Sequence, residues 1–299
     1  MTDEYVLFVG DISWDTTLVV DRLPDPDEKV IASSLVDSVG GVTANAAIAC
    51  SLAGTPSKLL TSVGTDIPGR SAVEAAEKTG LAVTAHISPD HSTCRAVITL
   101  DGSGEKRLVL APAVAMYPPI SATQDMNLDD VAWVHTALYD LDAAAALIQR
   151  CREQSIPWSI DLEPATIPAS LDELEPYLRG CTTVFANMRA ARRLGPTIAE
   201  DLSYLGVHEI VQTLGPDGAR LIISGRVTAI PAPKMSAPVR DTTGAGDALA
   251  GWFVSERMSD RGAETALRTA VNAASYTVRS HGASASYPTR RVLAAHAVQ

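Results

Sequence analysis

Basic and aromatic residues are both scarce in this chain of 299 residues. Lysine and arginine together number 24 against 35 aspartates and glutamates, so the formal net charge is −11. This balance argues against nucleic acid as the main partner, because a phosphate backbone is bound by clustered cations. It leaves room for one small anion, which a single turn of backbone amides can hold.

Long apolar runs and paired cysteines are missing as well. The opening MTDEYVLFVGD has two early acids and a short apolar run, so we expect neither a signal peptide nor a membrane span. The six histidines show no metal-ligand spacing, and no zinc site is expected. The cysteines lie far apart without a CxxC pair, which predicts reduced, buried thiols in a cytoplasmic protein. They are Cys50, Cys94, Cys151 and Cys181.

Apolar residues make up 46% of the chain, enough for a large core, and short apolar runs alternate with helix-length segments. This alternation predicts an α/β protein: a mostly parallel sheet with helices on both faces, and ligands at the carboxyl ends of the strands. With no repeat or linker, residues 1–299 are expected to form a single domain. The expected strands are Val6–Val9, Lys58–Val63, Trp133–Thr136, Trp158–Asp161, Thr183–Phe185, Glu209–Thr213 and Arg220–Ser224. The expected helices are Thr43–Leu52, Ser71–Thr79, Asp142–Gln154, Ile198–Leu205, Asp247–Arg257 and Ala263–Ser280.

Two stretches interrupt the alternation. Residues 17–36 read as extended segments around Pro24 and Pro26. Residues 84–110 contain CRAVITL and RLVLA on either side of DGSGEKR, which is a hairpin pattern. Together they are expected to form a small antiparallel sheet, either as a lid over the active site or as an ordinary edge of the main sheet.

A glycine-rich turn near the C-terminus, VRDTTGAGDALAGWF, sets a carboxylate directly behind small residues. Small residues let a ligand approach the backbone amides closely. A helix that begins at Gly246 or Asp247 points its first free N–H groups out of its end, where a phosphoryl group can sit. Asp247 fits either a catalytic carboxylate or a helix cap. The chain has no GxxxxGK[ST] run and no early GxGxxG, which excludes a Walker A loop and a dinucleotide fingerprint.

A second turn, SVGGVTANAAIACSLAG, combines Gly40 and Gly41 with Asn45 in the first turn of an expected helix. Paired glycines permit close ligand approach, and an amide side chain both donates to and accepts from hydroxyl groups. A helix start with a polar first turn explains the same pattern, so this turn does not decide between the two interpretations.

Four segments, in order along the chain, carry a resemblance to a known family. GGVTANAAIACSLAG, followed by SVGTDIPGR, resembles its N-terminal signature, and DTTGAGDALAGWF resembles its C-terminal signature. TLGPDGA resembles its nucleotide-supporting strand and turn, and GDISWD resembles the first-strand segment that ends in a substrate-binding acid. The family is that of the ribokinase-like (PfkB) carbohydrate kinases. The resemblance implies ATP-dependent phosphorylation of a hydroxyl on a small sugar-like substrate, with a β lid that commonly forms a homodimer.

The resemblance also implies a role for each residue of the glycine turn. Asp247 matches the family's catalytic base, while Gly244, Ala245 and Gly246 match its anion hole. Phosphoryl transfer needs in-line positioning and charge stabilisation more than covalent chemistry, which fits these roles. The base accepts its proton late, so a strongly raised pKa is not required. Mg²⁺ bound with ATP supplies further neutralisation.

The remaining implied residues fall into three sets. The sugar-contacting set is Asp15, Gly40, Gly41 and Asn45. The nucleotide set is Asn187, Thr213, Gly215, Gly218 and Asn272. The set that matches the family's monovalent cation site, expected to hold K⁺ mostly through carbonyl oxygens, is Asp241, Thr243, Thr277, Ser280, Gly282 and Ser286.

The sequence departs from the family pattern near the expected Mg²⁺ position and near the expected sugar site. The run Asn187-Met188-Arg189-Ala190 lacks the usual glutamate near Mg²⁺, and GGVTAN replaces the GGKGAN of ribokinases. Near His135-Thr136-Ala137-Leu138, where ribokinases carry an acid that holds the sugar, no acid is present. HTALYDL does not resemble the Ser/Gly/Pro-rich loop of sugar-phosphate kinases. Ribose is therefore weakly supported, and an unphosphorylated substrate is favoured.

Several substrates and one different class of protein remain open. The candidate substrates are a hexose, a keto-deoxy sugar acid, another modified sugar, or a nucleoside, for whose base Trp14 is the well-placed aromatic residue. Arg95 and Arg107 either meet a substrate carboxylate or ATP phosphates, or are solvated strand charges. The other class is a non-catalytic sugar-sensing protein, which Ala190 favours and the intact GAGD run opposes.

Overall fold

A computed structural model describes residues 4–102, 106–111, 116–168, 170–235 and 238–296. Its centre is a nine-stranded sheet in the order β13-β12-β11-β10-β9-β8-β1-β4-β5. Neighbouring strands are parallel except for β11–β12 and β12–β13, which are antiparallel. The strands are β1 (Tyr5–Val9), β4 (Ser57–Gly64), β5 (Ala82–Ser88), β8 (Val131–Ala137), β9 (Trp158–Leu162), β10 (Thr183–Asn187), β11 (Glu209–Thr213), β12 (Ala219–Ile223) and β13 (Arg226–Ile230).

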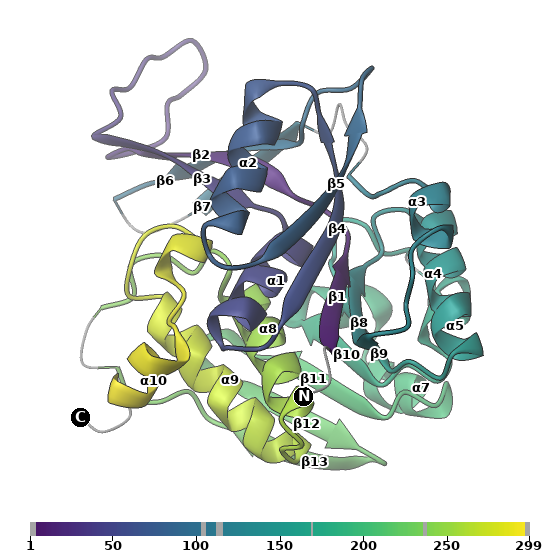
Figure 1. Cartoon of the computed structure of the whole chain (residues 1–299). Helices are drawn as coiled ribbons and strands as arrows, with labels where there is room; N and C mark the ends of the chain where they lie inside the picture. Colours follow the sequence, from purple (N-terminus) through teal and green to yellow (C-terminus); the bar gives the residue numbers. More distant parts are fainter. Residues whose placement is uncertain (1–3, 103–105, 112–115, 169, 236–237, 297–299) are drawn as a thin grey trace.

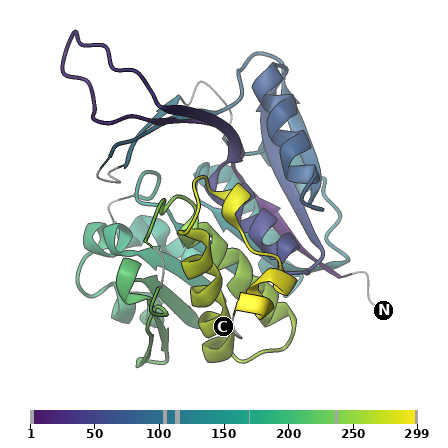
Figure 2. The same cartoon turned by 90° about the vertical axis from the view of Figure 1, so that its left-hand side faces the viewer.

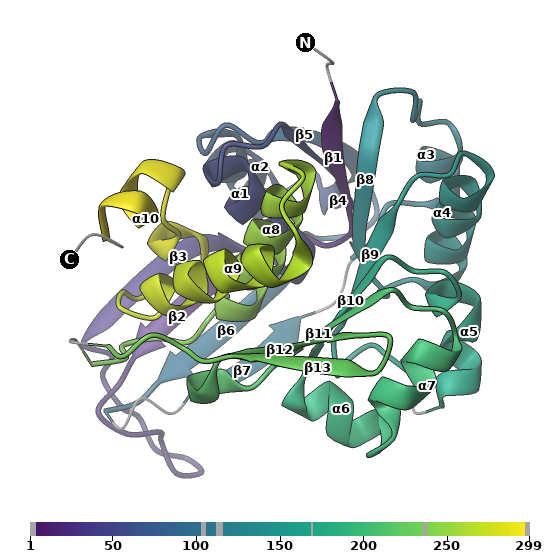
Figure 3. The same ribbon diagram turned by 90° about the horizontal axis from the view of Figure 1, so that it is seen from below.

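Helices cover both faces of this sheet (Figures 1 and 3). One layer holds α1 (Val42–Leu52), α2 (Ile67–Glu77), α8 (Ala245–Met258), α9 (Ala263–Thr277) and α10 (Arg290–His296). The other holds α3 (Ile120–Gln124), α4 (Leu141–Glu153), α5 (Leu171–Leu178), α6 (Met188–Leu194) and α7 (Ile198–Tyr204). Alternate residues of β1 serve the two layers, because successive side chains point to opposite faces: Val6 and Phe8 pack in one core cluster, Leu7 and Val9 in the other.

A smaller sheet stands beside the large one, with strand order β3-β2-β6-β7. Its strands are β2 (Ser13–Val19), β3 (Ser34–Gly40), β6 (Arg95–Leu100) and β7 (Lys106–Ala111). The pairs β2–β3 and β6–β7 are antiparallel as expected, but β2 and β6 run parallel. The connection from β2 to β3 projects from the body of the molecule (Figures 1 and 2).

The expected elements are all present, with differences of up to four residues at their ends, as at the start of α2. Residues 84–88, expected in the smaller sheet, instead belong to β5 and pair in parallel with β4 in the large sheet. The elements that the alternation did not predict are short or lie at an edge: β5, β13, α3, α5, α6 and α10. Their apolar patterns are too brief to outweigh turn residues.

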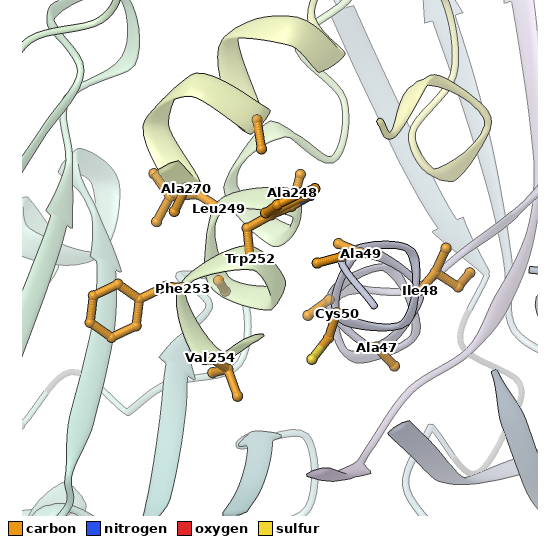
Figure 4. Packing of buried hydrophobic residues seen from close by; sticks show 14 of the residues in the cluster. Ala47, Ile48, Ala49, Cys50, Ala248, Leu249, Trp252, Phe253, Val254 and Ala270 are labelled. Atoms are coloured by element: carbon orange, nitrogen blue, oxygen red, sulfur yellow. The ribbon is translucent and has the colours of Figure 1, made fainter. Parts of the chain in front are cut away.

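The contact between α1 and α8 brings together two segments that are far apart in the sequence (Figure 4). Small residues of α1, among them Ala49 and Cys50, face α8. Trp252 and Phe253 of α8 are fully buried, with Phe253 on the side away from α1. A Cβ at Gly251 would lie 2.2 Å from the Ala46 carbonyl oxygen. Only glycine therefore allows the two helices to approach this closely, and the approach aligns their N-terminal turns.

The cysteines and the helix lengths are two further features of the fold. All four cysteine thiols are free and buried. Among the described residues, none of the helices combines the length and the apolar character that a membrane crossing requires.

Candidate active site

The carboxyl ends of the central parallel strands meet at one edge of the large sheet. Asp11 follows β1, Glu163 follows β9, Asn187 ends β10 and Thr213 ends β11. The N-terminal turns of α1 and α8 reach the same region, since Asn45 of α1 contacts Asp247 of α8. Ligands of open α/β sheets bind at this edge, so the candidate active site is built here.

Asp247 and Asn45 meet across 202 positions of sequence: the Asn45 amide donates to Asp247 Oδ2 at 2.8 Å. Burial raises the pKa of Asp247 to about 7, with smaller upward contributions from the Glu163 and Asp11 carboxylates and a downward one from the Asn45 hydrogen bond. The oxygen Oδ1 of Asn45 is buried and has no hydrogen-bond partner among the described residues. A carboxylate poised near neutral pH beside an unused acceptor can take a proton from a hydroxyl group and orient it.

The glycine turn before α8 is held by contacts on one side and open on the other. Gly244 precedes the helix with φ 73°, and its carbonyl accepts a hydrogen bond from the Tyr287 hydroxyl at 2.9 Å. A Cβ at Gly244 would lie 2.4 Å from that hydroxyl. A Cβ at Gly246 would meet no atom within 4 Å. The protein itself does not require a small residue at Gly246, whereas a ligand seated on the first amides of α8 would.

Asp15 lies on β2, where its carboxylate faces Gly40 at the end of β3. Ser13 donates to Asp15 Oδ1 at 2.6 Å, and a Cβ at Gly40 would lie 2.0 Å from Asp15 Oδ2. Burial raises the pKa of Asp15 to about 6, against the hydrogen bond from Ser13. Gly41 has φ 102°, and a Cβ there would lie 2.8 Å from the Asp11 carbonyl oxygen. The structure thus brings Asp15, Gly40, Gly41 and Asn45 to one side of Asp247.

Four ionisable residues of this region were missed in the sequence. Asp11 is buried and accepts hydrogen bonds from the Val42 and Thr43 amides at 2.8 and 2.9 Å, so it caps α1. Burial raises the pKa of Asp11, Glu163 and Asp161, and neighbouring carboxylates raise that of Asp161 further. Tyr139 lies near the same carboxylates, and burial raises its pKa. Asp11, Tyr139 and Glu163 follow strand-like runs and Asp161 ends one, which was a signal that could have found them.

The smaller sheet contributes a lysine to the site. Lys106 of β7 pairs with Leu100, which puts it on the same face of the sheet as Asp15, and its ammonium lies 3.2 Å from Thr243 Oγ1. Its charge lowers the pKa of Asp247 and of Asp15. The register puts Arg95 and Arg107 on the opposite face, where Arg95 donates to Thr16 Oγ1 at 3.3 Å. The lysine of DGSGEKR, and neither arginine, points toward the site.

Trp14 also lies on the face of β2 opposite to Asp15, because successive strand residues alternate. It packs against the core cluster of α1 and α8. The expectation that it forms an aromatic slot for a base beside Asp15 is therefore wrong, and Tyr139 is the aromatic side chain near the carboxylates.

The expected nucleotide residues lie along the next strands of the same edge. Thr213 ends β11, and the turn that follows has positive φ at Gly215 and Gly218. A Cβ at Gly215 would meet nothing within 4 Å, so that side of the turn is open. Asn272 is an exposed residue of α9. No hydrogen bond joins Asn272 to the other members of the set within the described ranges.

Asn187 and Ala190 belong to the run that lacks the family's usual glutamate, and both have structural roles here. The Asn187 side chain caps α6, because its Oδ1 accepts from the amides of Arg189 and Ala190 at 2.9 Å each. The side chain of Ala190 is fully buried in the core. In this conformation, position 190 offers the site no polar side-chain group. Glu163, which follows β9, interacts electrostatically with Arg189 and Lys106.

The expected cation residues come together from two segments. Asp241 is buried, and its carboxylate accepts from the Thr243 amide and hydroxyl at 2.8 and 2.6 Å and from the Gly282 amide at 2.9 Å. Burial alone would raise the pKa of Asp241, but these hydrogen bonds outweigh it and leave the pKa below its ordinary value. Thr277, Ser280 and Ser286 lie on the segment that Gly282 ties to Asp241. Both oxygens of the Asp241 carboxylate already accept hydrogen bonds and orient the backbone. The ligands left for a cation are therefore backbone carbonyl oxygens.

The donor groups also bear on divalent metal. Over the part of the chain that the structure describes, no group of three or more His, Cys, Asp or Glu side chains is arranged to hold a metal ion. Mg²⁺ does not require such a group, because it keeps several water ligands and usually binds through substrate phosphates and one or two carboxylates. Glu163 and Asp247 are the carboxylates that such an ion would approach.

A model of the pfkB family of carbohydrate kinases matches residues 3–290. The chain belongs to this family. Membership confirms the predicted family and enzyme class, an ATP-dependent carbohydrate kinase. Similar curated proteins span almost the same length: the ATP-dependent ribose-1-phosphate kinase of Halopiger xanaduensis is 28% identical over 97% of each chain. The nucleoside kinase of Methanothermobacter thermautotrophicus is 26% identical over 96% of this chain and 93% of its own.

Solved structures confirm the fold. The ribokinase of Arabidopsis thaliana, solved with ribose and ATP, superposes with a TM-score of 0.82 at 22% identity and covers 99% of this chain and 98% of that one. The nucleoside kinase of Methanocaldococcus jannaschii gives a TM-score of 0.81 at 20% identity, with 98% of both chains covered. The ribokinase-like α/β fold with its small additional sheet is therefore established for this member of the family.

Proposed function

We propose that this kinase phosphorylates a hydroxyl group of a small unphosphorylated sugar or sugar derivative. Asp247 is the general base, and the amides of Gly244, Ala245 and Gly246 form the anion hole for the transferring phosphoryl group. The observation that carries the proposal is the pairing of Asn45 with Asp247, whose pKa of about 7 suits proton acceptance near neutral pH.

Hydroxyl groups of the substrate are bound by Asp15, Asn45 and the backbone of Gly40 and Gly41. Asn45 orients Asp247 through its amide and keeps its buried oxygen for a substrate hydroxyl. Asp247 removes the proton from the attacking hydroxyl as the new P–O bond forms and the bond to ADP breaks, and the proton stays on the carboxylate. Mg²⁺ bound with ATP supplies charge neutralisation, and Lys106 supplies a further positive charge from the smaller sheet.

The nucleotide is bound by Asn187, Thr213, Gly215, Gly218 and Asn272. K⁺ is bound by the cation set, which is Asp241, Thr243, Thr277, Ser280, Gly282 and Ser286. The smaller sheet acts as a lid on a single domain formed by residues 1–299. Its outer face forms a homodimer, which the exposed apolar residues Leu35, Val97 and Val109 support. The four free thiols support a cytoplasmic location.

The charge of the site favours an unphosphorylated substrate. Asp11, Asp15, Asp161, Glu163 and Asp247 interact electrostatically with one another or with shared neighbours. A phosphate already on the substrate would enter this field against repulsion, which Lys106 and Arg189 offset in part. The relative from Halopiger xanaduensis bears the name of a ribose-1-phosphate kinase, so sugar phosphates belong in the test.

A nucleoside is the second candidate substrate, because Tyr139 provides an aromatic surface among the carboxylates and one relative is named a nucleoside kinase. A panel of hexoses, pentoses, keto-deoxy sugar acids, nucleosides and ribose 1-phosphate in an ADP-release assay separates the candidates. We expect the highest kcat/KM with an unphosphorylated sugar. A preference for ribose 1-phosphate would overturn the charge argument. If the protein binds nucleotide but releases ADP with no compound of the panel, a sugar-sensing protein is favoured.

A further inference from the structure

A second concave site lies at the C-terminal end of α9, beside the segment that Gly282 ties to Asp241. Ser280 of the expected cation set is among its lining residues. The site is an open cavity of about 700 Å³ between the last turn of α9, α10 and the segment before Asp241. Figures 1 and 3 show α10 beside the end of α9, opposite to the β10–β13 part of the large sheet. None of the proposed anion-hole residues lines the cavity, nor do Thr213, Gly215, Gly218 or Asn272.

The lining of this cavity is basic in a protein whose net charge is −11. Its ionisable residues are Arg240, Tyr276, Arg279, His281 and His296, and no aspartate or glutamate is among the lining residues. Within the described ranges, neither Arg240 nor Arg279 forms an ion pair with a carboxylate. An acidic protein that gathers unpaired guanidinium groups in one concavity creates a local field that attracts anions.

The Arg279 side chain is also held in place. The guanidinium of Arg279 lies over the Tyr276 ring at 5.6 Å, and its Nη1 lies 2.9 Å from His296 Nε2. The His296 ring in turn packs edge-on against Tyr276 at 5.4 Å. A guanidinium fixed by stacking keeps donors free for a bidentate contact, which is the geometry that favours phosphate over a point-like anion.

The walls of the cavity continue into the turn that precedes α8. The Arg240 amide donates to the Val278 carbonyl at 2.8 Å, and the Gly282 amide donates to Asp241 Oδ2 at 2.9 Å. An anion bridging Arg240 and Arg279 would hold these two segments together and restrain the turn Asp241–Gly246.

We propose that this cavity binds a small multivalent phosphate-bearing anion, separately from the nucleotide, and that its occupancy tightens nucleotide binding through the turn before α8. The proposal does not depend on which sugar the enzyme phosphorylates. By reciprocity, the anion and the nucleotide must change each other's affinity by the same factor.

The test is calorimetric titration of pyrophosphate into the full-length protein with ADP at saturating concentration and no added Mg²⁺. We expect one pyrophosphate site whose Kd rises at least tenfold in Arg240→Gln/Arg279→Gln. The matched control is Arg268→Gln/Arg291→Gln, which removes the same number of charges from α9 and α10 at residues that do not line the cavity. Arg240→Gln alone is a second variant that leaves the Arg279–Tyr276–His296 packing in place, should the double variant melt early.

Two results would overturn the site: equal pyrophosphate affinity in wild type and Arg240→Gln/Arg279→Gln, or full displacement of pyrophosphate by ADP. An equal loss of pyrophosphate affinity in Arg268→Gln/Arg291→Gln would also overturn the site, because the effect would then depend on net charge alone. For the coupling, we expect pyrophosphate to lower the Kd of ADP by about threefold in wild type and not in Arg240→Gln/Arg279→Gln. An unchanged Kd of ADP with pyrophosphate bound would refute the coupling and leave the site.

Discussion

At the scale of single residues, Asp247 shows how one position serves two competing demands. A carboxylate in the first turn of a helix favours folding through the free amides and the helix dipole. Burial among other acids disfavours the same charge and raises its pKa to about 7. The charge that chemistry needs is therefore held at a cost in stability, as is common at functional sites.

Asp247→Asn is expected to lower kcat at least about 100-fold, because the amide cannot accept the proton of the attacking hydroxyl. Its oxygen still accepts the hydrogen bond from Asn45, so nucleotide affinity should change little. Steady-state ADP release and ADP titration measure the two quantities. Asp142→Asn, in the first turn of α4, is the matched control for loss of a helix-terminal carboxylate. Near-normal turnover in Asp247→Asn would show that Asp247 is not the general base and acts only at the start of the helix.

The same substitution predicts a pH-dependent gain in stability. The folded-state pKa of Asp247 is about 7, above its ordinary value, so folding favours the protonated form and loses stability as pH rises from about 4 through about 7. Asparagine resembles the protonated form. Asp247→Asn should therefore be more stable than wild type at pH 8, by about 1 kcal/mol or more, and equally stable near pH 4. Urea unfolding at both pH values tests this, and a variant less stable at pH 8 would contradict it.

At the scale of elements, the smaller sheet has two faces with different surroundings. The pairing register puts Asp15, Ile98, Lys106 and Leu108 on the face toward the site. Leu35, Val97 and Val109 lie on the other face and are 61%, 41% and 69% exposed. An exposed apolar row on a sheet of this kind is typical of a surface that another chain covers.

Val97→Asp is expected to convert a homodimer into monomers, because it sets a charge at the centre of the outer apolar face. Leu108→Asp, on the inner face, should instead raise ADP release in the absence of sugar, since a solvated lid admits water to the site. Sedimentation measures the first effect and the release assay the second. Val227→Asp on β13, an exposed valine of the large sheet, is the control. A wild-type protein that sediments as a monomer would refute the dimer.

Lys106 makes the lid part of the catalytic apparatus in this proposal. Its ammonium contacts Thr243, whose hydroxyl donates to Asp241, so the lid, the glycine turn and the cation segment are connected by two side-chain contacts. Position on β7 decides which charged residue reaches inward, because alternate residues face opposite sides.

At the scale of the whole molecule, the site depends on segments that lie far apart in the sequence. α1 supplies Asn45 and α8 supplies Asp247. The segment 277–287 holds the turn before α8, because Gly282 donates to Asp241 and Tyr287 donates to the Gly244 carbonyl. A ligand that binds only when these segments are assembled stabilises the entire fold by mass action.

K⁺ is expected to raise the Tm relative to Na⁺ or tetramethylammonium at equal ionic strength, because carbonyl oxygens around Asp241 and Gly282 exist as a set only in the folded state. At a concentration about 100 times Kd, the gain is about 2.7 kcal/mol. Asp241→Ala should remove the difference between the salts and slow turnover, while Asp129→Ala, an exposed acid elsewhere, should keep it. Equal Tm and equal rates in all three salts would exclude the cation site.

The sequence by itself determined the α/β class, the order of the main strands and helices, and the two glycine turns. These depend on local causes: apolar periodicity, small residues at turns and polar residues at helix starts. The same local reasoning explains its errors. It placed residues 84–88 in the smaller sheet, because the apolar pattern of a strand does not show which strand it pairs with. It also set Trp14 beside Asp15 without knowing which face of β2 each would occupy.

Only the tertiary structure decided which of these residues meet. The contact of Asn45 with Asp247 requires α1 and α8 to pack closely, which Gly251 permits. The choice of Lys106 over Arg95 and Arg107 follows from strand register, and the burial that raises the pKa of Asp247 comes from elements throughout the chain. Such long-range contacts arise from the summed packing of many side chains, so no short stretch of sequence contains them.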